Sequence, residues 1–232
     1  MILGIDSSAI SAGCALLEGD KIVAEQFLNT RGLTKRQLVH SETLLPMISA
    51  MLRSAGAELA DVEKIAVSAG PGSFTGLRIG ISTAKGLADA AHRPCVSVST
   101  LEAVAYNFTE IDGIICACMD ARRKQVYNAL FRSENGIITR LCEDRAISAA
   151  ELSEELSRLD GKVIFAGDGA ELMHAFTEEK YALSSPLLRY QRGSGVCFAA
   201  QNAPELAPAA LMPTYLRLPQ AERERLARDK AN

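Results

Sequence analysis

The sequence of 232 residues has no tryptophan, three histidines and only 5% aromatic residues. It lacks any uninterrupted apolar run near the ~20 residues that a membrane-spanning helix requires, and its first apolar residues meet Asp6 too early for a signal peptide. Basic residues are not in excess, since 25 Lys and Arg stand against 28 Asp and Glu. Because nucleic acid is bound mainly by Lys and Arg that neutralise phosphates, such a chain is a poor nucleic-acid binder on its own. These absences favour a globular cytoplasmic protein that would reach nucleic acid only within a complex.

The cysteines show no CxxC pair. In a chain of this length, isolated cysteines are typical of the reduced, buried thiols of a cytosolic protein. We therefore expect neither disulfides nor a cysteine-bound metal. The six residues concerned are Cys14, Cys95, Cys116, Cys118, Cys142 and Cys197.

The first half of the chain alternates between strand and helix patterns. The apolar periodicity, turn residues and helix caps predict three strands, then a helix, a strand, a helix, a strand and a short helix. One cap is the pair Ser99 and Glu102, which has capping-box spacing. The predicted strands cover residues 2–7, 12–17, 21–28, 64–69 and 94–98, and the helices cover 35–55, 75–90 and about 100–106.

The second half repeats this order, and Asp120 ends its first strand as Asp6 ends the earlier one. Strands are predicted at 114–120, 125–131, 137–141 and 163–166, with helices at 149–159 and 170–176. Ser148 and Glu151 provide a further capping box. Two tandem βββαβαβα lobes are the α/β plan of the actin-like ATPases (ASKHA, ribonuclease H-like architecture), in which ATP lies between the lobes. We expect a first lobe at 1–106, a second at 107–217, and a helix at 218–232 that packs back on the first lobe.

The segment that follows the fourth strand is rich in small residues. Gly76, Gly80, Ala84 and Ala88 recur every four residues and therefore share one helix face. Such a face favours close packing, against either the same lobe or a partner, and the alternative is a phosphate-binding loop. The GxxxxGK[ST] pattern of a phosphate loop is absent, which favours close packing.

This same segment, SAGPGSFTGLRIGISTAKGLA at 68–88, resembles the TsaB (YeaZ) family. The resemblance extends over nearly the whole chain through GIDSSAISAGCALLEG at 4–19, HSETLLPMI at 40–48, MDARRKQVYNALF at 119–131 and PTYLR at 213–217. It implies a non-catalytic paralogue of TsaD that acts with TsaD and the ATPase TsaE. Together these proteins place threonylcarbamoyl on the adenosine beside the anticodon of some tRNAs. The resemblance thus implies TsaD-type and TsaE-type partners, tRNA only within the complex, and a homodimer when the chain is alone.

The catalytic paralogue carries an HxxxH metal pair, and two histidines four residues apart can hold one ion. By the resemblance, Thr100 and Val104 occupy those positions here, and valine cannot bind a metal. His40, His92 and His174 are far apart in sequence and form no such pair. We expect no metal site and no catalytic residue.

A degenerate nucleotide site is the second expectation that the actin-like plan implies. Its candidate residues are Asp6, Ser7, Ser8, Asp120, Gly167 and Gly169. The turn after Asp120 offers Arg122, Arg123 and Lys124 in place of glycine, which is typical of an exposed basic turn, with phosphate attraction as the alternative. We expect that the chain requires no cofactor, with ATP or ADP and Mg²⁺ only at a complex interface.

Two helices are the candidate partner surface because their apolar or small residues exceed a single stripe. The candidate interface residues are Leu38, Leu44, Leu45, Ile48, Met51, Leu52, Gly76, Leu77, Gly80 and Ala84. If these helices are interface rather than core, Leu45→Glu or Gly80→Glu abolishes pairing and leaves the monomer folded.

Three functions fit the sequence to different degrees. The first is a scaffold subunit that binds and activates a TsaD-type paralogue, as the resemblance implies. The second is an active actin-like ATPase or small-molecule kinase, which Asp6 and Asp120 favour. The third is a metalloprotease-like hydrolase, which the absent metal ligands oppose.

Overall fold

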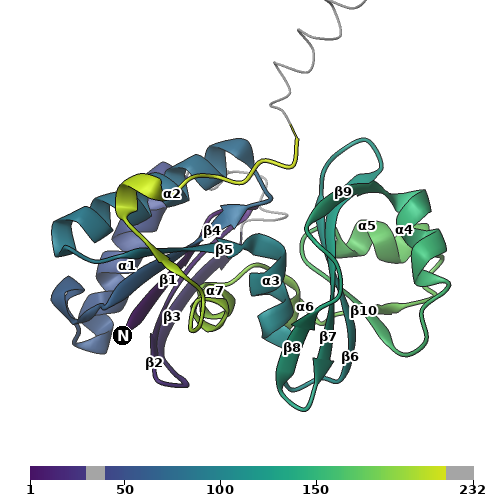
Figure 1. Cartoon of the computed structure of the whole chain (residues 1–232), viewed down its shortest axis with the longest axis horizontal. Helices are drawn as coiled ribbons and strands as arrows, with labels where there is room; N and C mark the ends of the chain where they lie inside the picture. The colour runs from purple at the N-terminus through teal and green to yellow at the C-terminus, as the bar shows by residue number, and fades with distance from the viewer. Residues whose placement is uncertain (30–39, 218–232) are drawn as a thin grey trace, which may run out of the picture.

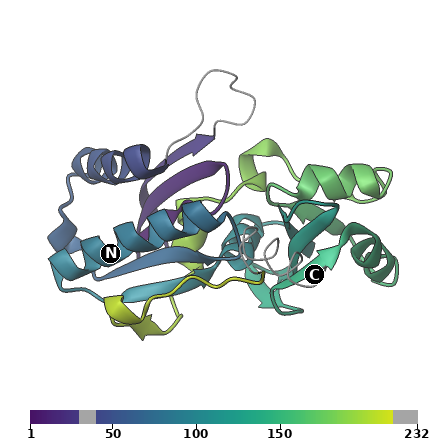
Figure 2. The same ribbon diagram turned by 90° about the horizontal axis from the view of Figure 1, so that it is seen from above.

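The computed structural model describes residues 1–29 and 40–217, which form two lobes side by side (Figures 1 and 2). Each lobe is built on a mixed sheet with helices against it. This α/β arrangement confirms the fold class predicted from the sequence. No helix within the described residues is long and apolar enough to cross a membrane.

The first lobe contains a six-stranded sheet in the order β12-β5-β4-β1-β2-β3. The strands β1, β2 and β3 are antiparallel neighbours, whereas β4 and β5 run parallel to β1. The bounds are β1 Ile2–Asp6, β2 Ser11–Glu18, β3 Lys21–Asn29, β4 Lys64–Gly70, β5 Cys95–Ser99 and β12 Glu205–Leu206.

Helices cover both faces of this sheet because successive strand residues point to opposite sides. Leu3 and Ile5 of β1 belong to the core beneath α1 (His40–Ala55) and α2 (Phe74–Ala91). Gly4 between them faces α7 (Gly193–Ala199), which lies on the other side of the sheet (Figure 1). The short η1 (Leu59–Asp61) precedes β4, and Pro46 lies inside α1.

The second lobe repeats the pattern with the sheet order β11-β10-β6-β7-β8, and β9 also pairs with β7. Its strands are β6 Gly113–Asp120, β7 Gln125–Glu134, β8 Ile137–Arg140, β9 Arg145–Ser148, β10 Val163–Ala166 and β11 Ala182–Leu183. Its helices are α4 Ala149–Leu156, α5 Ala170–Phe176 and α6 Pro186–Arg189. The predicted capping box at the start of α4 is confirmed, because Ser148 and Glu151 bond to each other's backbone N–H groups.

The helix α3 (Thr100–Ala105) lies between the two sheets (Figure 1) and continues into η2 (Tyr106–Phe108). Its Leu101 and Val104 share a core with Ile115 of β6. Ser99 caps α3 as predicted, but the Glu102 carboxylate turns to Arg140 of β8 at 2.9 Å. The two lobes therefore share α3 as a common packing element.

After α6 the chain returns to the first lobe, which corrects the predicted second lobe at 107–217. The helix α7 packs on β1 and β2, β12 pairs with β5, and η3 (Pro208–Ala210) follows beside α2. Gly193 permits this close approach, because a Cβ there would lie 2.5 Å from the backbone nitrogen of Ala15. Residues 35–39, with Leu38, and the predicted helix at 218–232 lie outside the described residues.

Candidate functional site

The turn after β1 is buried and bonded to the loop that precedes α2. The Ser8 N–H and hydroxyl groups each donate to the Asp6 carboxylate at 3.1 Å. The Ser7 hydroxyl donates to the Gly76 carbonyl at 2.9 Å, and the Ser73 N–H donates to the Ser8 carbonyl at 2.6 Å. Asp6, Ser7 and Ser8 have at most 1% of their surface exposed. The chain's own backbone therefore covers this turn.

Glycines make that covering possible. A Cβ at Gly72 would lie 2.5 Å from the Ser8 carbonyl oxygen, and a Cβ at Gly76 or Gly80 would come within 3.0 Å of Ser7. Real Cβ atoms do not approach other atoms so closely. The small-residue face therefore packs against its own lobe, as the close-packing interpretation predicted.

Burial decides the electrostatics of the first turn. Loss of solvent raises the pKa of Asp6 above its ordinary value, and the Ser8 hydrogen bonds and the charge of His40 oppose that rise. His40 is the first residue of α1, and its Nε2 atom lies 3.1 Å from the Ser11 carbonyl oxygen. The sequence did not indicate that His40 lies near Asp6, because more than 30 residues separate them.

The structure brings the other three nucleotide-site candidates together in the second lobe. A Cβ at Gly169 would lie 3.0 Å from the Asp120 nitrogen. The Gly167 N–H, however, donates to the Arg189 carbonyl at 2.6 Å, and the Gly169 N–H donates to the Cys118 carbonyl at 3.0 Å. The Asp120 carboxylate accepts the Arg122 N–H at 2.7 Å. Both glycine amides are thus engaged within the chain, so neither is directed at a ligand.

The positions aligned with the HxxxH pair are buried. Thr100 and Val104 have no exposed surface, and Val104 lies in the core shared by the two lobes. Within residues 1–29 and 40–217, no group of three or more His, Cys, Asp or Glu side chains is placed to hold a metal ion. His174 contacts the Tyr181 carbonyl oxygen at 3.0 Å, and His92 is the C-cap of α2.

Most of the predicted interface residues are core residues, which corrects that prediction. The apolar stripe of each helix is used to cover the first sheet, so these side chains are not available to a partner. Buried in this way are Leu44, Ile48, Met51, Leu52, Gly76, Leu77, Gly80 and Ala84. Leu45 alone among the predicted residues that are described is exposed, at 52%.

The residues that α1 and α2 expose to solvent differ from the interface residues predicted from the sequence. We call the exposed residues Leu45, Pro46, Ser49, Ser82 and Gly86 the outer helix face. The same helices also expose the charged residues Glu42, Arg53, Arg78 and Asp89. A Cβ at Gly86 would meet nothing within 4 Å. Glycine inside a helix lowers the stability of the helix by about 1 kcal/mol relative to alanine. No contact within the chain explains why position 86, on the open surface of α2, is a glycine. Gly86 was missed from the sequence, although its position inside the helix was the available signal.

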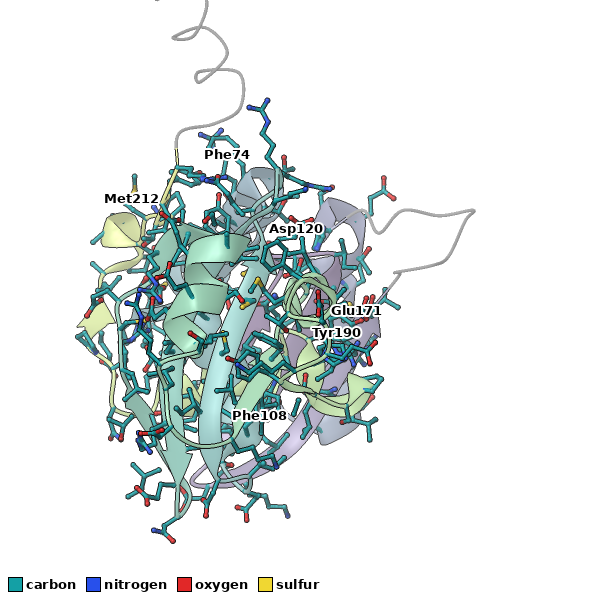
Figure 3. The ribbon with its side chains drawn as sticks, turned by 90° about the vertical axis from the view of Figure 1, so that its right-hand side faces the viewer. Phe74, Phe108, Asp120, Glu171, Tyr190 and Met212 are labelled. Carbon is teal, nitrogen blue, oxygen red and sulfur yellow. The ribbon has the colours of Figure 1, made fainter. Side chains whose placement is uncertain are left out.

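A second feature missed from the sequence is the role of the segment 213–217. The Thr214 N–H donates to the Ala69 carbonyl at 2.7 Å, and the Tyr215 ring stacks on Phe74 with 4.7 Å between centroids. Arg217 then donates to the Ala121 carbonyl in the second lobe at 2.9 Å. The segment therefore links the two lobes at the end of the molecule where Figure 3 shows Phe74 and Asp120.

The duplicated sheets, the shared α3 and the paired aspartate turns define a two-lobed α/β protein of the actin-like class. The comparisons with known proteins narrow this class. Residues 33–222 match the family described as "TsaD: tRNA N6-adenosine threonylcarbamoyltransferase".

Individual relatives agree with this match. The tRNA threonylcarbamoyladenosine biosynthesis protein TsaB of Bacillus subtilis is 34% identical over 225 residues, which is 95% of this chain and 96% of that protein. TsaB of Escherichia coli is 34% identical over 72% of this chain and 71% of its own length. The solved structure of YeaZ from Pseudomonas aeruginosa superposes with a TM-score of 0.73 at 25% identity, covering 93% of this chain and 99% of that one. The chain belongs to the TsaB (YeaZ) family of tRNA threonylcarbamoyladenosine biosynthesis proteins.

Proposed function

We propose that this chain is a non-catalytic subunit that binds and activates a TsaD-type paralogue in the cytoplasm. The paralogue would transfer threonylcarbamoyl to the adenosine next to the anticodon of tRNA. One observation carries the proposal: the turn of the actin-like fold at Asp6 is filled by the chain's own β4–α2 loop. The names of the relatives, which place them in this biosynthesis, give the substrate.

The residues available for chemistry support a non-catalytic role. Valine at position 104 offers no metal ligand, and Thr100 is fully buried beside it. In the second lobe, Gly167 and Gly169 direct their amides to backbone carbonyls. A nucleotide with Mg²⁺ would therefore need residues of the partner, at the boundary between subunits.

The outer helix face is the proposed contact with the paralogue. Its side chains are apolar or small, and Gly86 lets another backbone approach α2 closely. Leu45 and Pro46 expose apolar surface on α1, and exposed apolar surface is common at interaction sites. The same face would pair two copies of the chain when the paralogue is absent. A TsaE-type ATPase and tRNA would join the assembled pair.

The test combines a pairing assay with a modification assay. We expect Leu45→Glu to abolish co-elution with the TsaD-type protein and, with it, tRNA modification in the reconstituted system. The matched control is Leu187→Glu on α6, where the leucine is 78% exposed in the second lobe. Both variants should unfold at the temperature of the parent, because neither side chain is buried. Equal pairing by the two variants would refute the outer helix face as the contact.

A second pair of variants tests whether the chain contributes chemistry. We expect Asp6→Asn and Asp120→Asn to pair normally and to support modification at the parental rate. Loss of modification with intact pairing in either variant would favour the alternative of an active actin-like ATPase. That alternative rests on the aspartates that end β1 and β6.

A further inference from the structure

The hairpin between β6 and β7 has an unusual backbone for its residue types. Arg122, Arg123 and Lys124 have φ values of 67°, 56° and 57°, so three successive residues are left-handed. Glycine and asparagine adopt this conformation readily, whereas other L-residues are disfavoured there. Backbone hydrogen bonds hold the turn, including one of 3.0 Å from the Ala121 N–H to the Gln125 carbonyl. The hairpin therefore carries long cationic side chains at positions where its backbone geometry favours glycine.

The segment 213–217 brings Arg217 to the same place and contacts Arg78 of α2. Arg217 donates to the Ala121 carbonyl at the base of the hairpin. Tyr215, two residues earlier and hence within about 7 Å along the chain, accepts a hydrogen bond from Arg78 at 3.1 Å. The Arg78 guanidinium lies 3.9 Å above the centre of the Phe74 ring. Arginines from both lobes therefore lie near the stacked rings of Phe74 and Tyr215, on the side of the molecule where Figure 3 labels Phe74 and Asp120.

We call this surface the basic edge, and it consists of Arg78, Arg122, Arg123, Lys124 and Arg217. Among the ion pairs of the described residues, one involves the basic edge. In it the Asp120 carboxylate lies 3.9 Å from the Arg122 guanidinium, and the Arg122 side chain is 87% exposed. The Arg78 and Arg217 groups donate to a phenol and to a backbone carbonyl, which do not cancel their charge. The basic edge is thus locally cationic in a chain of net charge −3.

We propose that the basic edge binds the sugar–phosphate backbone of the RNA substrate within the assembled complex. This inference rests on the proposed function, which supplies RNA as the polyanion. The cations are spread over two lobes, and Arg78, Arg122, Arg123 and Lys124 are exposed while Arg217 is partly buried. This spread suits an extended chain of phosphates better than a single small anion. Arginine beside an exposed aromatic ring is also a common means of holding nucleic acid without reading its sequence. The three left-handed residues of the hairpin are exposed, so their cations face solvent.

The test measures the affinity of the reconstituted complex for labelled tRNA by fluorescence anisotropy over a series of salt concentrations. The double variant Arg123→Glu and Lys124→Glu is compared with Arg132→Glu and Lys162→Glu, which make the same change in charge. Arg132 pairs with Ile114 at the start of β6, and Lys162 precedes β10 at the same end of the sheet. Both control residues are exposed and lie at the opposite end of the strands from the hairpin.

We expect the hairpin variant to lose about tenfold in affinity, and the slope of log affinity against log salt to fall by about 2. The control variant should have the same tRNA affinity and the same salt dependence as the parent. Co-elution with the TsaD-type protein is measured on the same samples. Failure of the parent chain to pair would refute the proposed function, whereas intact pairing with equal tRNA affinity in both double variants would refute the RNA surface.

A single substitution separates a recognition role from a structural one. Arg123→Gly removes the cation and also relieves a left-handed residue, so the melting temperature should rise while tRNA affinity falls. A hairpin that serves only the fold would show the rise in melting temperature with unchanged affinity. That second result would overturn the proposal.

Discussion

Two glycines of the same helix should respond in opposite directions to the same substitution. Gly76 is the third residue of α2 and faces the turn after β1, where a Cβ would come within 3.0 Å of the Ser7 carbonyl oxygen. Gly86 is ten residues further along α2, and a Cβ there would meet nothing within 4 Å. We expect Gly76→Ala to destabilise the isolated chain and Gly86→Ala to stabilise it.

The magnitudes follow from packing and helix propensity. At position 76 the Ser7 backbone would have to move by roughly 1 Å to restore an ordinary contact. Overpacking of this kind raises the free energy of the folded state by up to about 3 kcal/mol, while alanine recovers about 1 kcal/mol of helix propensity. The net loss of about 2 kcal/mol lowers the melting temperature by about 4–8 °C in a chain of this size. At position 86 only the gain of about 1 kcal/mol remains, which raises the melting temperature by about 2–4 °C.

Thermal unfolding of both variants beside the parent measures these shifts directly, and urea unfolding gives the free energies. Circular dichroism serves as the control that helix content is unchanged at low temperature. A Gly76→Ala variant as stable as the parent would show that the turn after β1 moves easily. The turn after β1 would then not be rigidly filled by the chain.

Three further predictions concern polar contacts. Burial raises the pKa of Asp6 in the folded chain, so its ionisation weakens folding as the pH rises through that pKa. The Asp6→Asn variant should therefore have a higher melting temperature than the parent near neutral pH. This difference should disappear as the pH approaches 3.8, the ordinary pKa of an aspartate. Ser148→Ala removes the hydroxyl that accepts the Glu151 N–H at 3.1 Å, and urea unfolding should show a loss of about 1 kcal/mol. Glu102 and Arg140 form a partly exposed ion pair at 2.9 Å. A double-mutant cycle of Glu102→Ala and Arg140→Ala should give a coupling free energy of about 0.5–1 kcal/mol.

The longer strands were predictable from the sequence because apolar alternation and turn residues agree locally, whereas the short β9, β11 and β12 were not predicted. The strand predicted at 125–131 extends to Glu134, since β7 pairs with β6 as far as Ser133. Asn135 and Gly136 follow with φ values of 52° and 80°, as a tight hairpin requires. The turn dipeptide was a usable signal for this boundary.

Local sequence patterns could not predict that residues 193–217 pack on the first lobe. The strand β12 has two residues, which is too short for any periodicity, and its partner β5 lies about a hundred residues earlier. Gly193 and Gly195 mark the close approaches of α7, but glycine alone does not say which backbone approaches it. Only the packed structure identifies Ala15 and Ala103 as the neighbours.

The candidate interface failed for a related reason. The sequence correctly singled out the small face of α2, yet it could not tell whether a partner or the chain itself covers that face. Ser7, almost seventy residues before Gly76, is the covering group. Leu45 and Gly86 differ from their buried neighbours only in facing away from the sheet, and a surplus of apolar residues along a helix does not show which of them face outward.

The two lobes are repeats, but their first turns have been closed by different means. In the first lobe the β4–α2 loop is bonded to Ser8 and the first turn of α2 is bonded to Ser7, and the carboxylate of Asp6 is enclosed. In the second lobe Asp120 remains partly exposed, and the glycine amides beside it are engaged by backbone carbonyls. In both lobes the polar groups of the turn bond to other parts of the chain, which holds the backbone of the turn in place. In the first lobe these contacts hold the start of α2 against the turn after β1, and a surface that is already ordered loses less conformational entropy when a partner binds it.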